Sequence, residues 1–184
     1  MKALLGCTAI FLGMLSLGAF AQQAQNPQPR MPVVRQERDM TTQVPAPAEP
    51  LKITFGEKSA TWTVATLASL PHVTVTVHNE HTKADEIYSG IPLIALLAPM
   101  GVSEHPRGKD LRLYVVAEGS DLYEVVYASG EITPDVSSST VIVADTENGK
   151  ALTGDGPLKL IATGEKRPAR WVRNLVAVKV FAAE

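Results

Sequence analysis

The chain has 184 residues, 45% of them hydrophobic and 20% charged, with 17 Lys and Arg against 19 Asp and Glu. This length leaves room for one ordinary domain and excludes a two-domain enzyme of usual size. A net charge of −2 and few aromatic residues provide neither a basic track nor a stacking platform, so nucleic acid is not an expected partner. The single cysteine, Cys7, excludes an internal disulfide framework and a Cys-rich zinc module.

The N-terminal segment has the pattern of an export signal. Residues 3–21 form an apolar run behind Lys2, and Ala19 and Ala21 supply the small residues that signal peptidase requires. We predict a signal peptide over 1–21 and a periplasmic or secreted mature protein with no membrane span. A membrane anchor is an alternative, because the run approaches the roughly 20 residues that cross a bilayer. Lipidation at Cys7 is another, although few residues precede this cysteine.

A Pro- and Gln-rich segment follows, over residues 22–50. Such a composition buries too little apolar surface to offset the entropy of the chain. We therefore predict a disordered linker at 22–50 and a single folded domain at 51–184.

The folded part is predicted to consist mainly of strands. Short apolar runs, most of them rich in β-branched residues and bounded by Gly, Pro, Asn or Asp, recur along it. Val73 to Val77 is the clearest, with valines on one face and threonines on the other, and Asn148-Gly149 favours a tight hairpin turn. The predicted strands are 51–55, 61–64, 73–77, 111–117, 122–128, 140–144, 158–162 and 175–181.

Helical periodicity is scarce. Pro92 begins one helix of two to three turns that ends before Gly101, and a shorter helical turn covers 64–70 before Pro71. Many strands with one or two short helices predict an α+β fold, as a β-rich single domain.

Two groups of residues are candidates for binding. His78 and His81, close to Glu80, Asp85 and Glu86, form the best metal-like cluster, and the alternative is a polar loop at a strand end. The basic stretch Lys166 to Arg173 is a candidate anion site, because guanidinium groups form paired hydrogen bonds to oxyanions and Trp171 offers a flat face. Alternatively, its cations pair with the acidic middle of the chain, between Glu118 and Asp155, and Trp171 caps the core.

The ordered series of patterns resembles the oxidoreductase molybdopterin-binding domain of sulfite-oxidase-like proteins over essentially all of 51–184. The segments that carry this resemblance are 62–71, 73–77, 88–93, 115–123, 141–145, 148–152, 156–161 and 170–172. The resemblance implies that Lys159, Arg170 and Trp171 line a site for the pterin phosphate or an oxyanion. To these residues the basic stretch adds Lys166, Arg167 and Arg173.

The departures from that family bear on function. The family binds molybdenum through a cysteine after the strand that 73–77 resembles, whereas this chain has His78 to His81 there and no cysteine after Cys7. Imidazole does not reproduce soft thiolate ligation. Leu122 also stands where the family has glycine, and there are no paired arginines before the apolar run, as the export route for folded cofactor proteins requires.

These observations leave two functions open. The first is an exported non-catalytic module that binds a small anion, a pterin-like ligand or a redox partner protein. The second is a molybdopterin-dependent oxidoreductase acting on a small oxyanion, with its metal bound by His78, His81, solvent or a partner subunit. The missing cysteine argues against the second.

Overall fold

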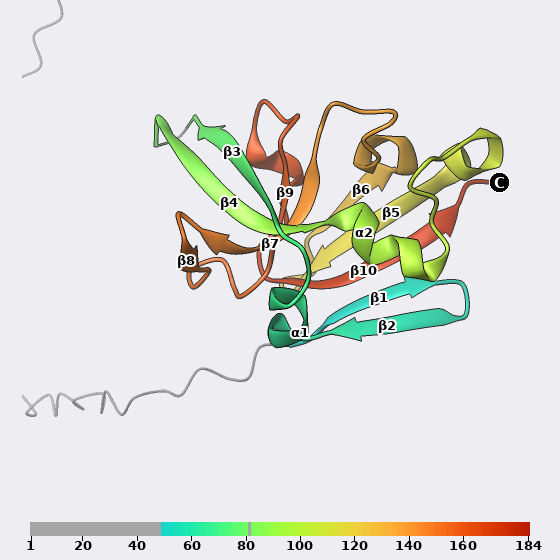
Figure 1. Ribbon diagram of the computed structural model, residues 1–184, viewed down its shortest axis with the longest axis horizontal. Helices are drawn as coiled ribbons and strands as arrows, with labels where there is room; N and C mark the ends of the chain where they lie inside the picture. Colours follow the sequence, from blue (N-terminus) through green and yellow to red (C-terminus); the bar gives the residue numbers. More distant parts are fainter. Residues whose placement is uncertain (1–48, 81) are drawn as a thin grey trace, which may run out of the picture. The chain divides into compact units, whose positions relative to one another are not determined.

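The computed structural model describes residues 49–80 and 82–184. Ten strands and two short α-helices form the described part of one compact unit, as Figure 1 shows. The strands are β1 (Leu51–Phe55), β2 (Lys58–Trp62), β3 (Val73–Asn79), β4 (Ala84–Pro92), β5 (Leu113–Gly119), β6 (Glu124–Ala128), β7 (Val141–Glu147), β8 (Lys150–Ala151), β9 (Lys159–Ala162) and β10 (Leu175–Ala182). The helices are α1 (Val64–Ala68) and α2 (Leu93–Leu97), and 3₁₀ turns cover Ala98–Met100, Gly108–Arg112, Ser129–Ile132 and Pro168–Arg170.

The strands form two sheets. One has the order β2-β1-β10-β5-β6, and the other has the order β3-β4-β7-β8, with β9 also paired to β7. All neighbouring strands are antiparallel except β1 and β10, which run parallel. The predicted β-rich α+β single domain is therefore confirmed.

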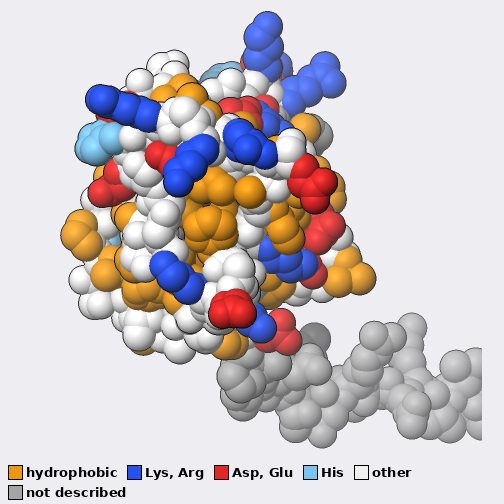
Figure 2. All heavy atoms as spheres, turned by 90° about the vertical axis from the view of Figure 1, so that its right-hand side faces the viewer, with side chains coloured by type: hydrophobic (Ala, Val, Ile, Leu, Met, Phe, Trp, Pro, Cys, Tyr) orange, Lys and Arg blue, Asp and Glu red, His pale blue; other side chains and the backbone are white. Residues whose placement is uncertain are grey.

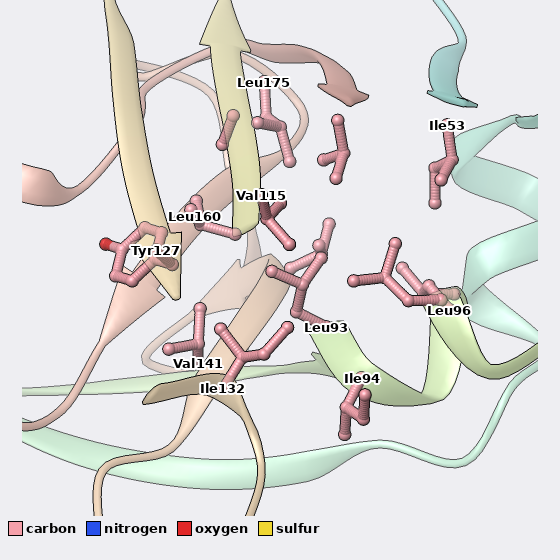
Figure 3. Packing of buried hydrophobic residues seen from close by; sticks show 14 of the residues in the cluster. Ile53, Leu93, Ile94, Leu96, Val115, Tyr127, Ile132, Val141, Leu160 and Leu175 are labelled. Atoms are coloured by element: carbon pink, nitrogen blue, oxygen red, sulfur yellow. The ribbon is translucent and has the colours of Figure 1, made fainter. Parts of the chain in front are cut away.

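The main core lies between the two sheets. Leucine and isoleucine side chains of α2 are buried there against Val115 of β5, Tyr127 of β6 and Leu160 of β9, as Figure 3 shows. A smaller cluster occupies the other face of β7, because successive residues of a strand point to opposite faces. Val141 and Val143 therefore belong to the main core, whereas Ile142 and Ala144 belong to the smaller cluster with Tyr88.

Local sequence signals explain the turns that position these elements. Asn148 and Gly149 both have positive φ, 51° and 75°, at the tip of the β7–β8 hairpin, as their sequence predicted. Thr63 caps α1 by accepting a hydrogen bond from the Thr66 backbone, and α2 continues into a 3₁₀ turn that ends at Gly101 with φ 104°.

Leu122 has a positive φ of 66° in the turn between β5 and β6. A left-handed conformation at a non-glycine residue costs about 1 kcal/mol, and glycine adopts it freely. Leu122 is also 77% exposed, so its side chain does not gain burial in return. The conformation thus explains why glycine suits this position in the family that the sequence resembles.

The end of the domain shown in Figure 2 is separate from the strand ends that form the site described below. Hydrophobic side chains gather at the centre of this view, and Lys and Arg side chains lie around them. A shallow hollow here is lined by Phe55, Lys109, Arg112 and Leu113, among others. No helix in the described ranges is long and apolar enough to cross a membrane.

Candidate functional site

A cleft of about 480 Å³ lies where the end of β3, the start of β4, the β7–β8 hairpin and the Pro168–Arg170 turn meet. We call it the Lys159 cleft, after the buried lysine at the start of β9. Its lining residues are Asn79, Glu86, Tyr88, Asp121, Tyr123, Glu147, Asp155, Lys159, Pro168, Ala169, Trp171 and Arg173. Segments distant in the chain therefore form one polar and aromatic site.

Lys159 is the centre of a hydrogen-bonded chain in this cleft. Lys159 is only 7% exposed. Its Nζ donates hydrogen bonds to Asp155 Oδ2 at 2.6 Å and to the Tyr88 hydroxyl at 3.2 Å. Tyr88 in turn donates its hydroxyl proton to Glu86 Oε2 at 2.9 Å. Burial, followed by the hydrogen bond and negative charge of Glu86, raises the pKa of Tyr88, so its hydroxyl remains a donor at neutral pH.

Aromatic rings surround the ammonium group of Lys159. Nζ lies 5.0 Å from the Tyr88 ring centroid and 5.4 Å from that of Trp171. The two rings meet edge to face, with centroids 5.8 Å apart, and the Trp171 indole N–H donates to the Ala162 carbonyl at 3.0 Å. These contacts fix Trp171 both as a cap on the core and as a wall of the cleft.

Carboxylates outnumber cations in the Lys159 cleft. Glu86, Asp121, Glu147 and Asp155 line it, against Lys159 and Arg173. Both cations also face Asp155, since Arg173 Nη1 lies 3.9 Å from its Oδ1. The cleft is therefore suited to a ligand that donates hydrogen bonds rather than to a multiply charged anion.

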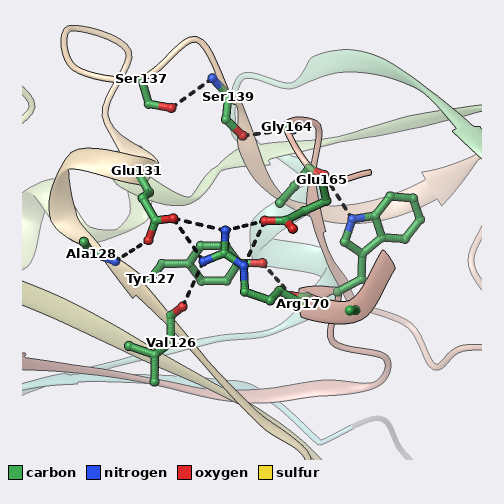
Figure 4. Close-up of polar contacts among 12 residues, drawn as sticks. Val126, Tyr127, Ala128, Glu131, Ser137, Ser139, Gly164, Glu165 and Arg170 are labelled. Carbon is green, nitrogen blue, oxygen red and sulfur yellow. Dashed lines mark hydrogen bonds and ion pairs between the residues drawn. The ribbon is translucent and has the colours of Figure 1, made fainter. Parts of the chain in front are cut away.

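The structure separates the predicted anion-binding residues into three places. Lys159, Trp171 and Arg173 line the Lys159 cleft. Lys166 and Arg167, together with Trp171, line a different groove beside β3. Arg170 points to neither, because its guanidinium group lies between Glu131 and Glu165, as Figure 4 shows.

Arg170 is held as a structural residue. Nε donates to Glu165 Oε1 at 2.8 Å, Nη1 donates to Glu131 Oε1 at 3.0 Å and to the Val126 carbonyl at 3.3 Å, and Cζ lies 4.6 Å from the centroid of the Tyr127 ring. The alternative interpretation, in which the basic stretch pairs with the acidic middle of the chain, holds at this residue. Lys179, which follows that stretch, pairs in the same way with Glu118 and Glu124.

We expect Arg170→Met to lower the free energy of unfolding by about 1–2 kcal/mol, mainly through the lost hydrogen bonds, because half-exposed ion pairs contribute little. The affinity of the Lys159 cleft for its ligand should not change, because Arg170 does not line that cleft. Thermal unfolding of both proteins, with and without ligand, checks this. Exposed Arg107→Met is the control and should leave the melting temperature unchanged. A variant that keeps its stability but loses affinity would restore Arg170 to the binding site.

The predicted histidine metal site is placed only in part. The exposed His78 Nδ1 lies 2.8 Å from Asp85 Oδ1, and His81 lies outside the described residues. Within 49–80 and 82–184, no three His, Cys, Asp or Glu side chains group closely enough to hold a metal. The pair of histidines thus stays a prediction.

Of the lining residues that were not among the predicted site residues, four matter most to the chemistry of the cleft: Glu86, Tyr88, Tyr123 and Asp155. Tyr88 and Tyr123 belong to the segments that carry the family resemblance, but the sequence alone does not distinguish a tyrosine that packs beside a turn from one that lines a site. Tyr123 does donate its hydroxyl proton to the Ala169 carbonyl. Glu86 lies near the predicted metal-like cluster and Asp155 ends the acidic middle of the chain, but the sequence does not bring them together, because their roles come from the meeting of β4, the Asp155 loop and β9.

Comparison with known proteins supports the fold. The crystal structure of the sulfane dehydrogenase SoxCD from Paracoccus pantotrophus matches with a TM-score of 0.56 and 23% identity, over 72% of this chain and 38% of that chain. The described domain therefore shares the fold of part of that protein, and it spans well under half of its length.

Sequence comparisons do not place the chain in a family. No family model matches. Over 82 residues the chain is 32% identical to the DNA primase small subunit PriS of Thermoplasma volcanium. The matched segment covers 45% of this chain and 23% of the primase.

Proposed function

We propose that this chain is an exported, non-catalytic binding module with a sulfite-oxidase-like fold, and that the Lys159 cleft is its ligand site. The observation that carries the proposal is a buried lysine held between Asp155 and Tyr88 and facing a polar cleft. Buried charges are costly unless they are paired, so such an arrangement is typical of a functional site.

The chemistry of the lining favours a flat heterocycle of the pterin type. An aminopyrimidine edge carries N–H donors, which the carboxylates of Glu86 and Glu147 accept, next to a ring carbonyl, which Lys159 can bind. Trp171 and Tyr88 supply apolar walls for the ring. A small inorganic anion is less well matched, because the carboxylates of the cleft would repel it.

The described residues do not match a complete molybdopterin cofactor. The fold shared with a sulfane dehydrogenase supports a pterin-type ligand for this chain. In this chain, however, the phosphate of the cofactor would meet excess carboxylates. The segment 78–81 stands where the family has its cysteine, and His78 pairs with Asp85 outside the Lys159 cleft. We therefore derive no chemical step through the cofactor.

The alternative function, a molybdopterin-dependent oxidoreductase, makes a different prediction. Elemental analysis of protein purified from its exporting host would find molybdenum at about one per chain, with an oxidised pterin released on denaturation. Molybdenum and pterin found together would show that a ligand other than cysteine holds the metal, because the sequence has no cysteine after Cys7. Pterin without molybdenum would fit the binding module instead.

Calorimetric titration of the full chain with pterin tests the binding module. We expect Lys159→Met to weaken binding at least about tenfold, because the buried partner for the ring carbonyl is lost while the apolar stem keeps its volume. The matched control is Lys166→Met, which removes an exposed lysine outside the cleft and should bind pterin normally.

Three results decide the proposal. Circular dichroism and thermal unfolding show whether Lys159→Met still folds, and Tyr88→Phe provides a second cleft variant that changes only a hydroxyl group. Titration with inorganic phosphate should give no heat, as the charge of the cleft predicts. Equal pterin affinity in wild type, Lys159→Met and Tyr88→Phe would reject the Lys159 cleft as the site.

A further inference from the structure

Strand β3 forms an edge of its sheet. Within the described ranges it pairs with β4 alone, over seven residues from Val73 to Asn79, and Figure 1 shows it at the margin of the domain. Thr74 and Thr76 are exposed, and Val73 is 37% exposed. Such an edge presents backbone N–H and C=O groups that can pair with another chain.

The β2 and β6 edges each carry a feature that hinders pairing, which β3 lacks. Lysine and proline are the usual protecting residues of an edge strand, and the segment Val73 to Asn79 contains neither. At the β6 edge, by contrast, the Arg170 guanidinium group occupies the Val126 carbonyl, and the β2 edge begins with Lys58. β3, with seven residues against five in β2 and in β6, is thus the longest of these three edges and the one best suited to pairing.

A groove of about 370 Å³ runs beside this edge, between β3 and the segment that links β9 to β10. We call it the β3 groove. Thr76, Val77 and His78 line one side, and Lys166, Arg167 and Pro168 line the other. A groove with two walls admits a single extended chain more readily than the folded sheet of a second copy.

The uncompensated charge of the β3 groove is positive. Its two carboxylates already have partners, since Glu165 binds Arg170 and Glu80 lies 2.6 Å from the ammonium group of Lys83. Lys166 and Arg167 are exposed and form no ion pair with any side chain in the described ranges. Charge complementarity therefore calls for an acidic occupant.

We infer that the β3 groove binds an extended acidic segment of a partner protein, which adds to β3 as a further strand and places carboxylates against Lys166 and Arg167. Backbone hydrogen bonds to β3 would supply affinity for any extended chain, and the two cations would select acidic ones. This inference does not depend on what the Lys159 cleft binds.

Two synthetic peptides test the inference on the full chain. One alternates Glu with Val over ten residues, and its counterpart has Lys in place of every Glu. We expect the acidic peptide alone to bind, with an affinity that falls as salt is raised. Lys166→Glu combined with Arg167→Glu should weaken its binding at least about tenfold, because two favourable charge contacts become repulsive.

The matched control reverses the exposed basic pair Arg107 and Lys109, at the other end of the domain, and should leave peptide affinity unchanged. Hydrogen exchange separates strand addition from general attraction of charge. On binding, amides of β3 should gain protection, whereas those of the β6 edge should not.

Three outcomes would overturn the inference. If the basic peptide bound as tightly as the acidic one, Lys166 and Arg167 would not select acidic chains. If the acidic peptide bound without protecting the β3 amides, it would not add to β3 as a strand. A dimer in sedimentation experiments with β3 already protected, in the absence of peptide, would identify a second copy of the chain as the occupant.

Discussion

Gly90→Ala is expected to lower the free energy of unfolding by about 3 kcal/mol, and the melting temperature by about 10 °C. Gly90 lies in β4, where the β4–β7 register shifts. A Cβ atom there would lie 2.2 Å from the Val143 carbonyl oxygen and 2.5 Å from Ala144 Cα. Both are backbone atoms of the central strand β7, so the two strands would have to move apart. Thermal and urea unfolding measure the loss.

Gly154→Ala is the matched control for this prediction. It adds the same methyl group in an exposed loop, where no atom lies within 4 Å of the new carbon. Its stability should therefore stay within about 0.5 kcal/mol of wild type. If the two variants were equally stable, the close approach of β4 and β7 at Gly90 would be wrong.

His72→Ala is expected to cost about 3 kcal/mol at pH 6, because it leaves a buried carboxylate without its cation. His72 Nε2 lies 2.9 Å from Asp145 Oδ2, and Nδ1 lies 2.7 Å from the Leu70 carbonyl oxygen. Both partners only accept hydrogen bonds, so the ring satisfies both when it is doubly protonated. Asp145 is 7% exposed, and its Oδ1 has no hydrogen-bond partner in the described ranges.

The pH dependence of this prediction has a definite sign. The hydrogen bond to Asp145, stronger than the opposing effect of burial, raises the pKa of His72 above its usual value. A raised pKa in the folded state gives stability that is fully present below the unfolded pKa, about 6.5, and is lost as pH rises through the folded pKa. The difference between wild type and His72→Ala should therefore be larger at pH 6 than at pH 9.

Urea unfolding at the two pH values measures this difference. The control is His105→Ala, whose partner Asp135 is half exposed, and we expect a loss below about 0.5 kcal/mol for it. A difference between wild type and His72→Ala that did not change with pH would show that folding leaves the pKa of His72 unchanged.

Most strands of this fold could be predicted from the sequence, because their residues are locally consistent. Val73 to Val77 alternates as a half-buried strand must, and Val77 is buried while Thr76 is exposed. Strand β4 and the two-residue β8 were not predicted, and the strand expected at 61–64 lies at Lys58–Trp62.

β4 has no apolar alternation at its start and contains Gly90 and Pro92. β4 is a strand because it pairs with β3 on one side and with β7 on the other. Its own residues do not show the pattern from which a strand is predicted.

The candidate site could be predicted less well than the fold. Lys159, Trp171 and Arg173 do meet, but Arg170 stands in the same basic stretch and points elsewhere. The 3₁₀ turn at Pro168–Arg170 separates the directions of these side chains, and the sequence does not show that geometry. Tertiary contacts also decide which cations are already neutralised, since Glu131 lies far from Arg170 in the chain.

The parallel pair of β1 and β10 has a consequence for the order of assembly. Lys52 pairs with Ala177 and Phe55 with Val180, so β1 lies between β2 and a strand that is synthesised much later. Contacts between distant parts of a chain form slowly, because loop closure must precede them. Leu51 and Ile53, which are fully buried in the finished domain, can therefore complete their burial only after β10 has been synthesised. Until then they would be available to a chaperone that recognises apolar segments.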